Sequence, residues 1–137
     1  YIQRILMNNQ TKQMLEKAQK ALIHAYAPYS NFSVAACIFT KAGNYYTGVN
    51  VENCSYGLTL CAEACAIAQM VSAGECSIQS VLIVCDNKKL CAPCGACRQR
   101  IHEFSTQDTT IHLCKDDTIS QTLSISELLP LAFSRIF

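Results

Sequence analysis

The apolar positions of the first fifty residues follow two spacings, one typical of helices and one typical of strands. Between residues 10 and 26 they recur every three or four positions, which predicts a helix that Pro28 would stop. The segments 32–39 and 44–50 are rich in β-branched, aromatic and small apolar residues, which predicts two strands. Gly43 falls between these segments, so we expect a hairpin with its turn at "KAGN".

The rest of the chain continues this alternation of helices and strands. We expect a largely apolar helix at 61–73 that Gly74 ends, followed by a strand at 80–85 that is covered on both faces. A helix at 95–104, a strand at 109–114 and a weaker strand near 118–123 should follow. The last element is a short helix within 125–133, in which Ser126 could cap the start and Pro130 could end it. Alternating helices and strands favour an α/β fold. We therefore predict one domain, residues 1–137, with a three-layer α/β/α sandwich on a mixed sheet of about five strands.

Composition narrows the classes of function. Half of the 137 residues are hydrophobic and 15% are charged, which is the composition of a folded domain and not of a disordered chain. The formal net charge is +1, and the sequence contains no basic tract of the kind that binds duplex nucleic acid. We expect a small-molecule partner rather than a nucleic acid. No apolar run reaches the length of a membrane span, and "YIQRILMNNQ" does not have the pattern of a signal peptide. We therefore expect no membrane association and a cytoplasmic protein.

The chain contains ten cysteines. Several of them lie inside apolar runs such as "VAACIF" and "VLIVCD", where a free cysteine behaves as a small hydrophobic residue. Secreted disulfide scaffolds are short, rich in loops and poor in core. We therefore expect free thiols in a reducing cytoplasm and no disulfide framework.

The segment "CAPCGACRQ" places Cys91, Cys94 and Cys97 at intervals of three. Such spacing is compatible with half a zinc site, with a redox pair, or with chance in a cysteine-rich chain. Cys61 lies far upstream at the start of another predicted helix, and two helix N-termini can meet at one end of a sheet. Three cysteine ligands would leave zinc an open fourth position, as catalytic zinc requires. Spacing alone leaves Cys91 and Cys65 open as alternative ligands.

Glu63 lies within the apolar stretch "LCAEACAIAQM", where burying a carboxylate is costly. Two residues after Cys61, it could face a metal-bound water without binding the metal, and so carry protons. The alternative is a solvated glutamate that stabilises the helix N-terminus.

The joint pattern of "CAE" and "PCGACRQ" resembles the zinc-dependent cytidine deaminases of the short, homotetrameric type. "YAPYSNFSVAA", "GVNVENCSY" and "ELLPLAF" extend the resemblance over residues 11–135. It implies one Zn²⁺ per chain, held by Cys61, Cys94 and Cys97. It also implies deamination of cytidine and deoxycytidine in pyrimidine salvage: zinc-bound hydroxide attacks C4 of the base while Glu63 shuttles the protons.

The same resemblance implies roles for residues outside the metal site. Asn50 and Glu52 would hold the ribose hydroxyls, although both could be ordinary polar residues at a strand end. Phe32 would pack near the nucleoside, and backbone groups of Ala62 and Cys94 would bind the amide edge of the base. Tyr56 and Phe133 would reach the site of a neighbouring subunit in a homotetramer. As isolated residues, the aromatic side chains would fit a core or an interface equally well.

Three positions depart from the pattern that the resemblance leads us to expect. Ala35 and Leu131 stand where glycine is common in the family, and Ala64 stands where many members have an arginine after the catalytic glutamate. That arginine offsets the charge of the thiolate ligands. Arg98, next to Cys97, could offset the thiolate charge in its place. The alternative is that Arg98 is an ordinary surface residue.

Three other classes of function remain open on sequence alone. A blasticidin S-type deaminase shares the zinc motifs, but "NVEN" with Glu52 favours a nucleoside. A polynucleotide deaminase would need positive charge along its substrate channel, which this near-neutral chain lacks. A structural zinc module would use four protein ligands, whereas three are matched here.

Overall fold

The computed structural model describes residues 7–135. Its elements follow in the order α1 (Asn9–Leu22), β1 (Val34–Thr40), β2 (Tyr45–Val49), the 3₁₀ helix η1 (Tyr56–Leu58), α2 (Ala62–Ser72), β3 (Ile78–Cys85), α3 (Gly95–Glu103), β4 (Thr110–Lys115), β5 (Thr118–Ser124) and α4 (Ile125–Leu128). The strands form one sheet in the order β2-β1-β3-β4-β5. The β3–β4 pair is parallel and the other pairs are antiparallel, so the predicted mixed five-stranded sheet is confirmed.

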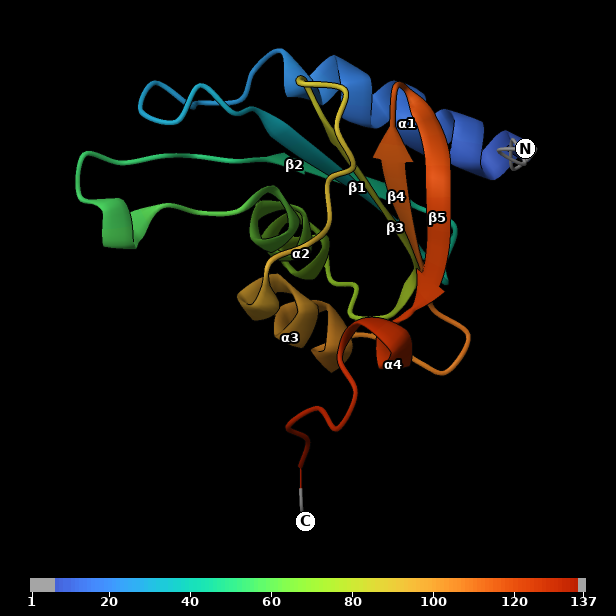
Figure 1. Ribbon diagram of the computed structural model, residues 1–137. Helices are drawn as coiled ribbons and strands as arrows, with labels where there is room; N and C mark the ends of the chain where they lie inside the picture. The colour runs from blue at the N-terminus through green and yellow to red at the C-terminus, as the bar shows by residue number, and fades with distance from the viewer. Residues whose placement is uncertain (1–6, 136–137) are drawn as a thin grey trace.

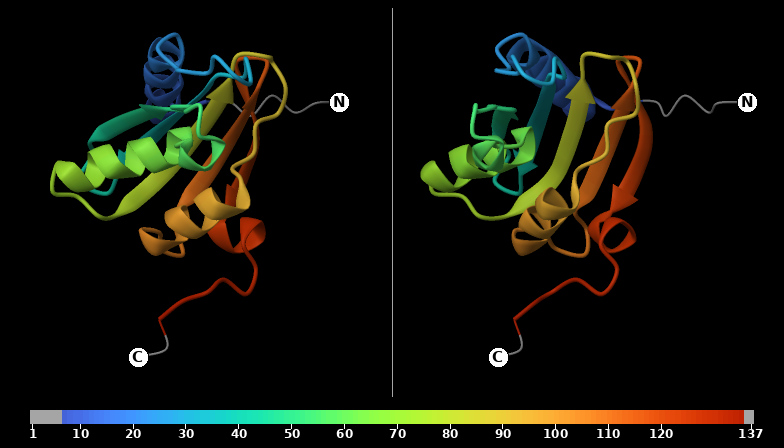
Figure 2. Two further views of the ribbon diagram at one scale, coloured as in Figure 1. Left: turned by 90° about the vertical axis from the view of Figure 1, so that its left-hand side faces the viewer. Right: turned by 60° about the vertical axis from the view of Figure 1, so that its left-hand side comes forward.

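Helices cover both faces of this sheet (Figure 1; Figure 2). On one face, Met14, Leu15 and Ala18 of α1 pack against alternate residues of β1 and β3, such as Ala35 and Leu82. On the other face, α2 and α3 pack against the residues that alternate with these, including Ala36, Ile38, Val81 and Ile83. Successive strand residues point to opposite faces, so both cores come from one set of strands. The predicted three-layer sandwich is confirmed.

The positions of several elements differ in detail from the sequence predictions. Helix α1 ends at Leu22 rather than at 26, because the chain turns so that Tyr26 pairs with Val51 in an isolated bridge. The cap of α4 is Ser124 rather than Ser126. Ser124 forms a capping box with Glu127, and the helix ends at Leu128, before Pro130. The predicted turn at Gly43 is present, and this glycine has a positive φ of 91°.

Gly48 of β2 lets α2 approach the sheet closely. A Cβ at this position would lie 2.3 Å from the backbone nitrogen of Ala66 and 2.4 Å from the carbonyl oxygen of Ala62. The backbone of α2 therefore rests directly on β2, which fixes where this helix begins.

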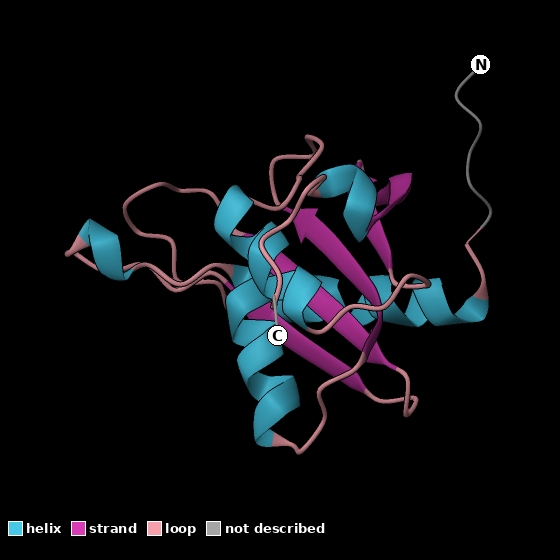
Figure 3. Cartoon of the chain, turned by 90° about the horizontal axis from the view of Figure 1, so that it is seen from below, coloured by secondary structure: helices cyan, strands magenta, loops and turns pink. Residues whose placement is uncertain are grey.

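Two segments project from the layered body. The segment 50–60 extends beyond the sheet with η1 at its tip (Figure 3), and its two sides pair through the bridge between Val51 and Leu60. The chain after α4 leaves the body as an extended tail (Figure 1). Among residues 7–135, no helix has the length and apolar character needed to cross a membrane.

Candidate metal centre and active site

Three thiols at the starts of two helices lie close together. Cys61 is the N-cap of α2, Cys94 is the N-cap of α3, and Cys97 lies in the first turn of α3. Their sulfurs all lie within 4.8 Å of one another, and the Sγ atoms of Cys61 and Cys94 are 3.8 Å apart. Two sulfurs that each bind zinc at about 2.3 Å with tetrahedral angles lie about 3.8 Å apart. The trio therefore fits one Zn²⁺ with an open fourth position.

The electrostatics of the trio are those of crowded, desolvated thiols. Burial raises the pKa of Cys61, and the nearby Cys94 raises it further. Burial also raises the pKa of Cys97, helped by the charge of Glu63. Burial opposes ionisation of Cys94 as well, but hydrogen bonds from Cys97, including its backbone N–H at 3.5 Å, bring the pKa of Cys94 below its ordinary value. Three sulfurs this close can all ionise only when a cation lies between them.

The structure separates these three thiols from the two alternatives that spacing had left open. Cys65 lies one turn further along α2 and is half-buried. Cys91 is buried and lines the hollow beside the trio, but burial raises its pKa to about 12, and the thiol that interacts with it most is Cys85. Among residues 7–135, the group of thiols that could hold a metal ion contains neither Cys65 nor Cys91.

Glu63 follows Cys61 in the first turn of α2 and is only 5% exposed. Burial raises the pKa of its carboxyl group. Its own backbone N–H, the Cys97 thiol and the positive charge of Arg100 partly oppose this shift. The carboxyl group lines the same hollow as Cys61 and Cys94. The structure therefore contains a buried glutamate beside three thiols that could hold a metal ion, rather than a solvated first-turn glutamate.

This hollow has a volume of about 220 Å³, and three further predicted residues, Phe32, Asn50 and Ala62, lie on its wall. The Asn50 amide is already engaged, because Oδ1 accepts from the Val34 N–H at 2.9 Å and Nδ2 donates to the Phe32 carbonyl at 2.8 Å. An amide oxygen has a second lone pair and an amide nitrogen a second hydrogen. Asn50 can thus shape the wall and still bind a ligand.

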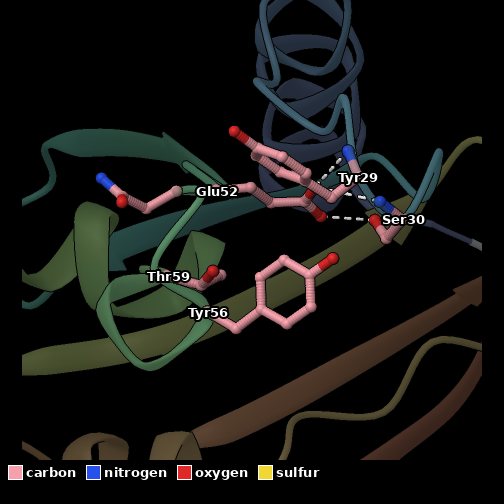
Figure 4. A pocket seen from close by; sticks show the side chains of 6 residues that line it. Tyr29, Ser30, Glu52, Tyr56 and Thr59 are labelled. Atoms are coloured by element: carbon pink, nitrogen blue, oxygen red, sulfur yellow. Dashed lines mark hydrogen bonds between the residues drawn. The ribbon is translucent and has the colours of Figure 1, made fainter.

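Glu52 lies in an adjoining hollow of about 230 Å³, which shares Thr59 with the first one (Figure 4). Its carboxylate accepts from the Tyr29 N–H at 3.0 Å, from the Ser30 N–H at 3.1 Å and from the Ser30 hydroxyl. The Ser30 hydroxyl and these N–H groups hold the pKa of Glu52 below its ordinary value. A carboxylate that stays ionised and keeps spare lone pairs can accept further hydrogen bonds from hydroxyl groups.

The two predicted aromatic residues lie on the surface of the chain. Tyr56 is 75% exposed in η1 and stacks edge-on against Tyr29 at 5.8 Å, so it borders the hollow that contains Glu52. Phe133 is 79% exposed in the C-terminal tail, where its carbonyl accepts from Gln99 Nε2 at 2.9 Å. Phe133 lines neither hollow of its own chain.

Arginine 98 does not have the position that the sequence led us to expect. Its Nε donates to the Pro93 carbonyl and its Nη1 to the Leu128 carbonyl, both at 2.9 Å, so Arg98 ties the loop before Cys94 to α4. Instead, Nη1 of Arg100 lies 3.9 Å from Cys97 Sγ. Sequence analysis missed Arg100, although a residue three positions after Cys97 on a helix lies on the same face.

Together, the fold and the site define an α/β protein with three thiols that could hold one metal ion and a buried glutamate beside them. The model of the cytidine and deoxycytidylate deaminase zinc-binding region matches residues 8–113. The chain belongs to this family. The family resemblance and the zinc cofactor predicted from the sequence are confirmed.

Relatives with known names and structures agree with this membership. A cytidine deaminase of Halalkalibacterium halodurans is 40% identical over 88% of this chain and 92% of its own length. A probable cytidine deaminase of Dictyostelium discoideum is 41% identical over 88% of this chain and 82% of its own. The crystal structure of cytidine deaminase from Burkholderia pseudomallei superimposes with a TM-score of 0.83 at 37% identity, covering 93% of this chain and all of that one.

Proposed function

We propose that this protein hydrolytically deaminates cytidine, and deoxycytidine, to the corresponding uracil nucleoside and ammonia. One observation carries the proposal: Glu63, Cys61 and Cys94 line one hollow, with Cys97 completing a group of thiols that fits zinc. Zinc, when bound, is a Lewis acid that lowers the pKa of a coordinated water. The ligands that we propose are Cys61, Cys94 and Cys97, for one Zn²⁺ per chain.

In this proposal Glu63 carries the protons. Water adds its oxygen to C4 of the base and the bond from C4 to the exocyclic nitrogen breaks. Glu63 takes a proton from the water, gives it to ring N3, and later helps to protonate the departing ammonia. The buried position of Glu63 supports this role, because a carboxyl group held away from bulk solvent can exchange protons with a bound ligand.

The remaining wall residues would bind the nucleoside. Phe32 contributes an apolar surface for the base, and the backbone of Ala62 and Cys94 lies at the helix starts where the amide edge would be held. Asn50 and Glu52 would bind the ribose. The shared border of the two hollows at Thr59 supports a single binding site that runs from the thiols to Glu52.

We also propose a homotetramer in which Tyr56 and Phe133 contribute to neighbouring sites. Exposed apolar side chains on the projecting segment and on the tail support an interface with other copies; they are Val51, Tyr56, Leu58, Leu60, Leu131 and Phe133. The predicted role in pyrimidine salvage belongs to the same proposal. Ten free thiols fit the predicted cytoplasmic location, where cysteines stay reduced.

A substrate comparison tests the proposed activity. The purified protein, with its zinc content counted per chain, is incubated separately with cytidine, deoxycytidine, blasticidin S and a cytosine-containing single-stranded oligonucleotide, and ammonia release is measured. We expect release from the two nucleosides. Release from blasticidin S alone, or from the oligonucleotide alone, would assign the site to another substrate class, and zinc binding without any release would favour a structural module.

A further inference from the structure

The proposed zinc ligands carry more negative charge than the metal neutralises. Three thiolates around a divalent cation leave one net negative charge, and each thiol must lose its proton to bind the metal, so nearby positive groups that favour the thiolate form help to retain the metal. The starts of α2 and α3 point their partial positive charges at the trio, and the Cys97 N–H donates to Cys94 Sγ at 3.5 Å. Cys97 itself is fully buried, so solvent does not stabilise its charge.

Arg100 places a full positive charge at this sulfur. Its Nη1 lies 3.9 Å from Cys97 Sγ, and the spacing of three residues on α3 brings both side chains to one face of the helix. Among the hydrogen bonds of residues 7–135, this is the one that a cationic side chain makes to a ligand sulfur. Two donor groups of Arg98 are occupied by carbonyl oxygens, and Ala64, next to Glu63, has no donor to offer.

We propose that Arg100 is a positioning residue of the metal centre, which holds Cys97 in place and offsets the thiolate charge so that zinc is retained. The inference rests on the proposed ligand set. The charge of Arg100 also reaches the Glu63 carboxyl group, where it partly opposes the rise in pKa that burial causes. Hydrogen bonds of this kind to metal ligands typically change metal affinity by about 10- to 100-fold.

Transfer of zinc to a chromogenic chelator tests this role without any assay of activity. Arg100→Met keeps an unbranched side chain of similar helix propensity but removes the charge and the N–H donors. We expect it to release zinc about tenfold faster than the parent, at the lower end of that range because Arg100 is exposed. Arg100→Lys, which keeps the charge, should lie between the two. Lys12→Met removes an exposed charge from α1, on the opposite face of the sheet, and should behave as the parent.

Salt separates an electrostatic role from a packing role. The difference between the parent and Arg100→Met should shrink in about 1 M salt, where the Debye length is about 3 Å. A release rate for Arg100→Met equal to that of the parent would overturn the inference. So would a salt-independent difference, or an Arg100→Lys variant as fast as Arg100→Met. A parent that binds no zinc would instead contradict the proposed ligand set.

Discussion

Cys97 and Cys91 are both buried thiols close to Glu63, but our proposed zinc site uses only Cys97. Cys97→Ala should lose most of the bound zinc, because two thiolates without the third no longer complete the coordination that fits the trio. Cys91→Ala is the matched control and should keep its zinc. Metal analysis of both purified variants, each reported per folded chain, measures the difference. Zinc loss from Cys91→Ala with retention by Cys97→Ala would reverse the assignment.

The proton-carrying role of Glu63 predicts a variant that folds and binds zinc but barely turns over. Glu63→Gln keeps the shape of the side chain and removes its ability to accept a proton. General acid–base groups typically contribute about 10²- to 10⁴-fold, and this group would serve several transfers, so we expect a loss at the upper end. Zinc content serves as the control. Turnover within about tenfold of the parent, below that range, would rule out the proposed role.

The hydrogen bonds to Glu52 predict an acid-sensitive contribution to stability. The folded pKa of Glu52 is lowered, chiefly by the Ser30 hydroxyl, so its stabilisation is present above the ordinary pKa of a glutamate and is lost as pH falls through the lowered value. Ser30→Ala should therefore be less stable than the parent at neutral pH, and the gap should narrow as pH falls to about 3. It should not close fully, because the Ser30 hydroxyl oxygen also accepts from the Phe32 N–H.

Urea unfolding at several pH values measures this gap. Ser55→Ala is the control, since Ser55 lies on the same projecting segment as Glu52, residues 50–60, and its side chain makes no capping hydrogen bond. A gap between Ser30→Ala and the parent that stays constant from neutral to acid pH would show that Glu52 does not respond to this hydroxyl group.

Single residues were predictable where the chemistry is local in sequence. Cys61, Glu63, Cys94 and Cys97 stand in short motifs at helix starts, and the structure brings their side chains together. Contacts between distant segments left weaker signals. The partners of Glu52 lie on the loop before β1, more than twenty residues away, and no local pattern pairs them. Arg98 was a candidate because it follows Cys97 directly, but its donors bind carbonyl oxygens, and the arginine at Cys97 Sγ is Arg100, three positions further along α3.

At the scale of elements, the contact between β2 and α2 decides where the proposed ligand Cys61 lies. Gly48→Ala would place a methyl group against the α2 backbone, which cannot move aside as a side chain would. Overpacking of this kind costs roughly 1–3 kcal/mol, occasionally more. We expect lower stability to urea together with weaker zinc retention, because α2 carries Cys61 and Glu63 at its start.

Gly57→Ala is the matched control for this prediction. Nothing lies within 4 Å of a Cβ built on Gly57, which is in η1 on the projecting segment. It should therefore keep parental stability and zinc content. Equal zinc retention by Gly48→Ala and Gly57→Ala would show that the close approach of α2 to β2 does not determine the geometry of the proposed zinc site.

Periodicity and composition predicted every strand of the sheet. The apolar pattern is clear in β1, β3 and β4, which are largely buried, and weaker in β5, which has one buried residue. The element ends were less well determined. Ser124 and Ser126 both precede the final apolar residues. The two hydrogen bonds between Ser124 and Glu127, at 2.7 Å and 3.2 Å, select Ser124 as the cap. The 3₁₀ helix at Tyr56–Leu58 has no buried residue, so the apolar pattern gave no sign of it.

At the scale of the whole molecule, the exposed aromatic residues predict that the active unit contains more than one chain. Phe133 is largely exposed on its own chain and lines neither hollow, so removing its ring should change little within a monomer. In the proposed tetramer the ring is buried beside a neighbour's substrate. Phe133→Ala should then raise the KM for cytidine and weaken assembly in sedimentation experiments, while its zinc content stays at the parental value.

A mixing experiment separates a role in a neighbour's site from a role in the same chain. Glu63→Gln chains lack the proton carrier but keep Phe133. Phe133→Ala chains lack the aromatic ring but keep Glu63. If Phe133 completes a neighbouring site, a mixed oligomer contains sites with an intact Glu63 from one chain and an intact Phe133 from the other. Activity after dissociation and reassembly of the mixture should therefore exceed the sum of the two separate variants. Activity equal to that sum, or a fully active parental monomer in sedimentation, would contradict the shared site.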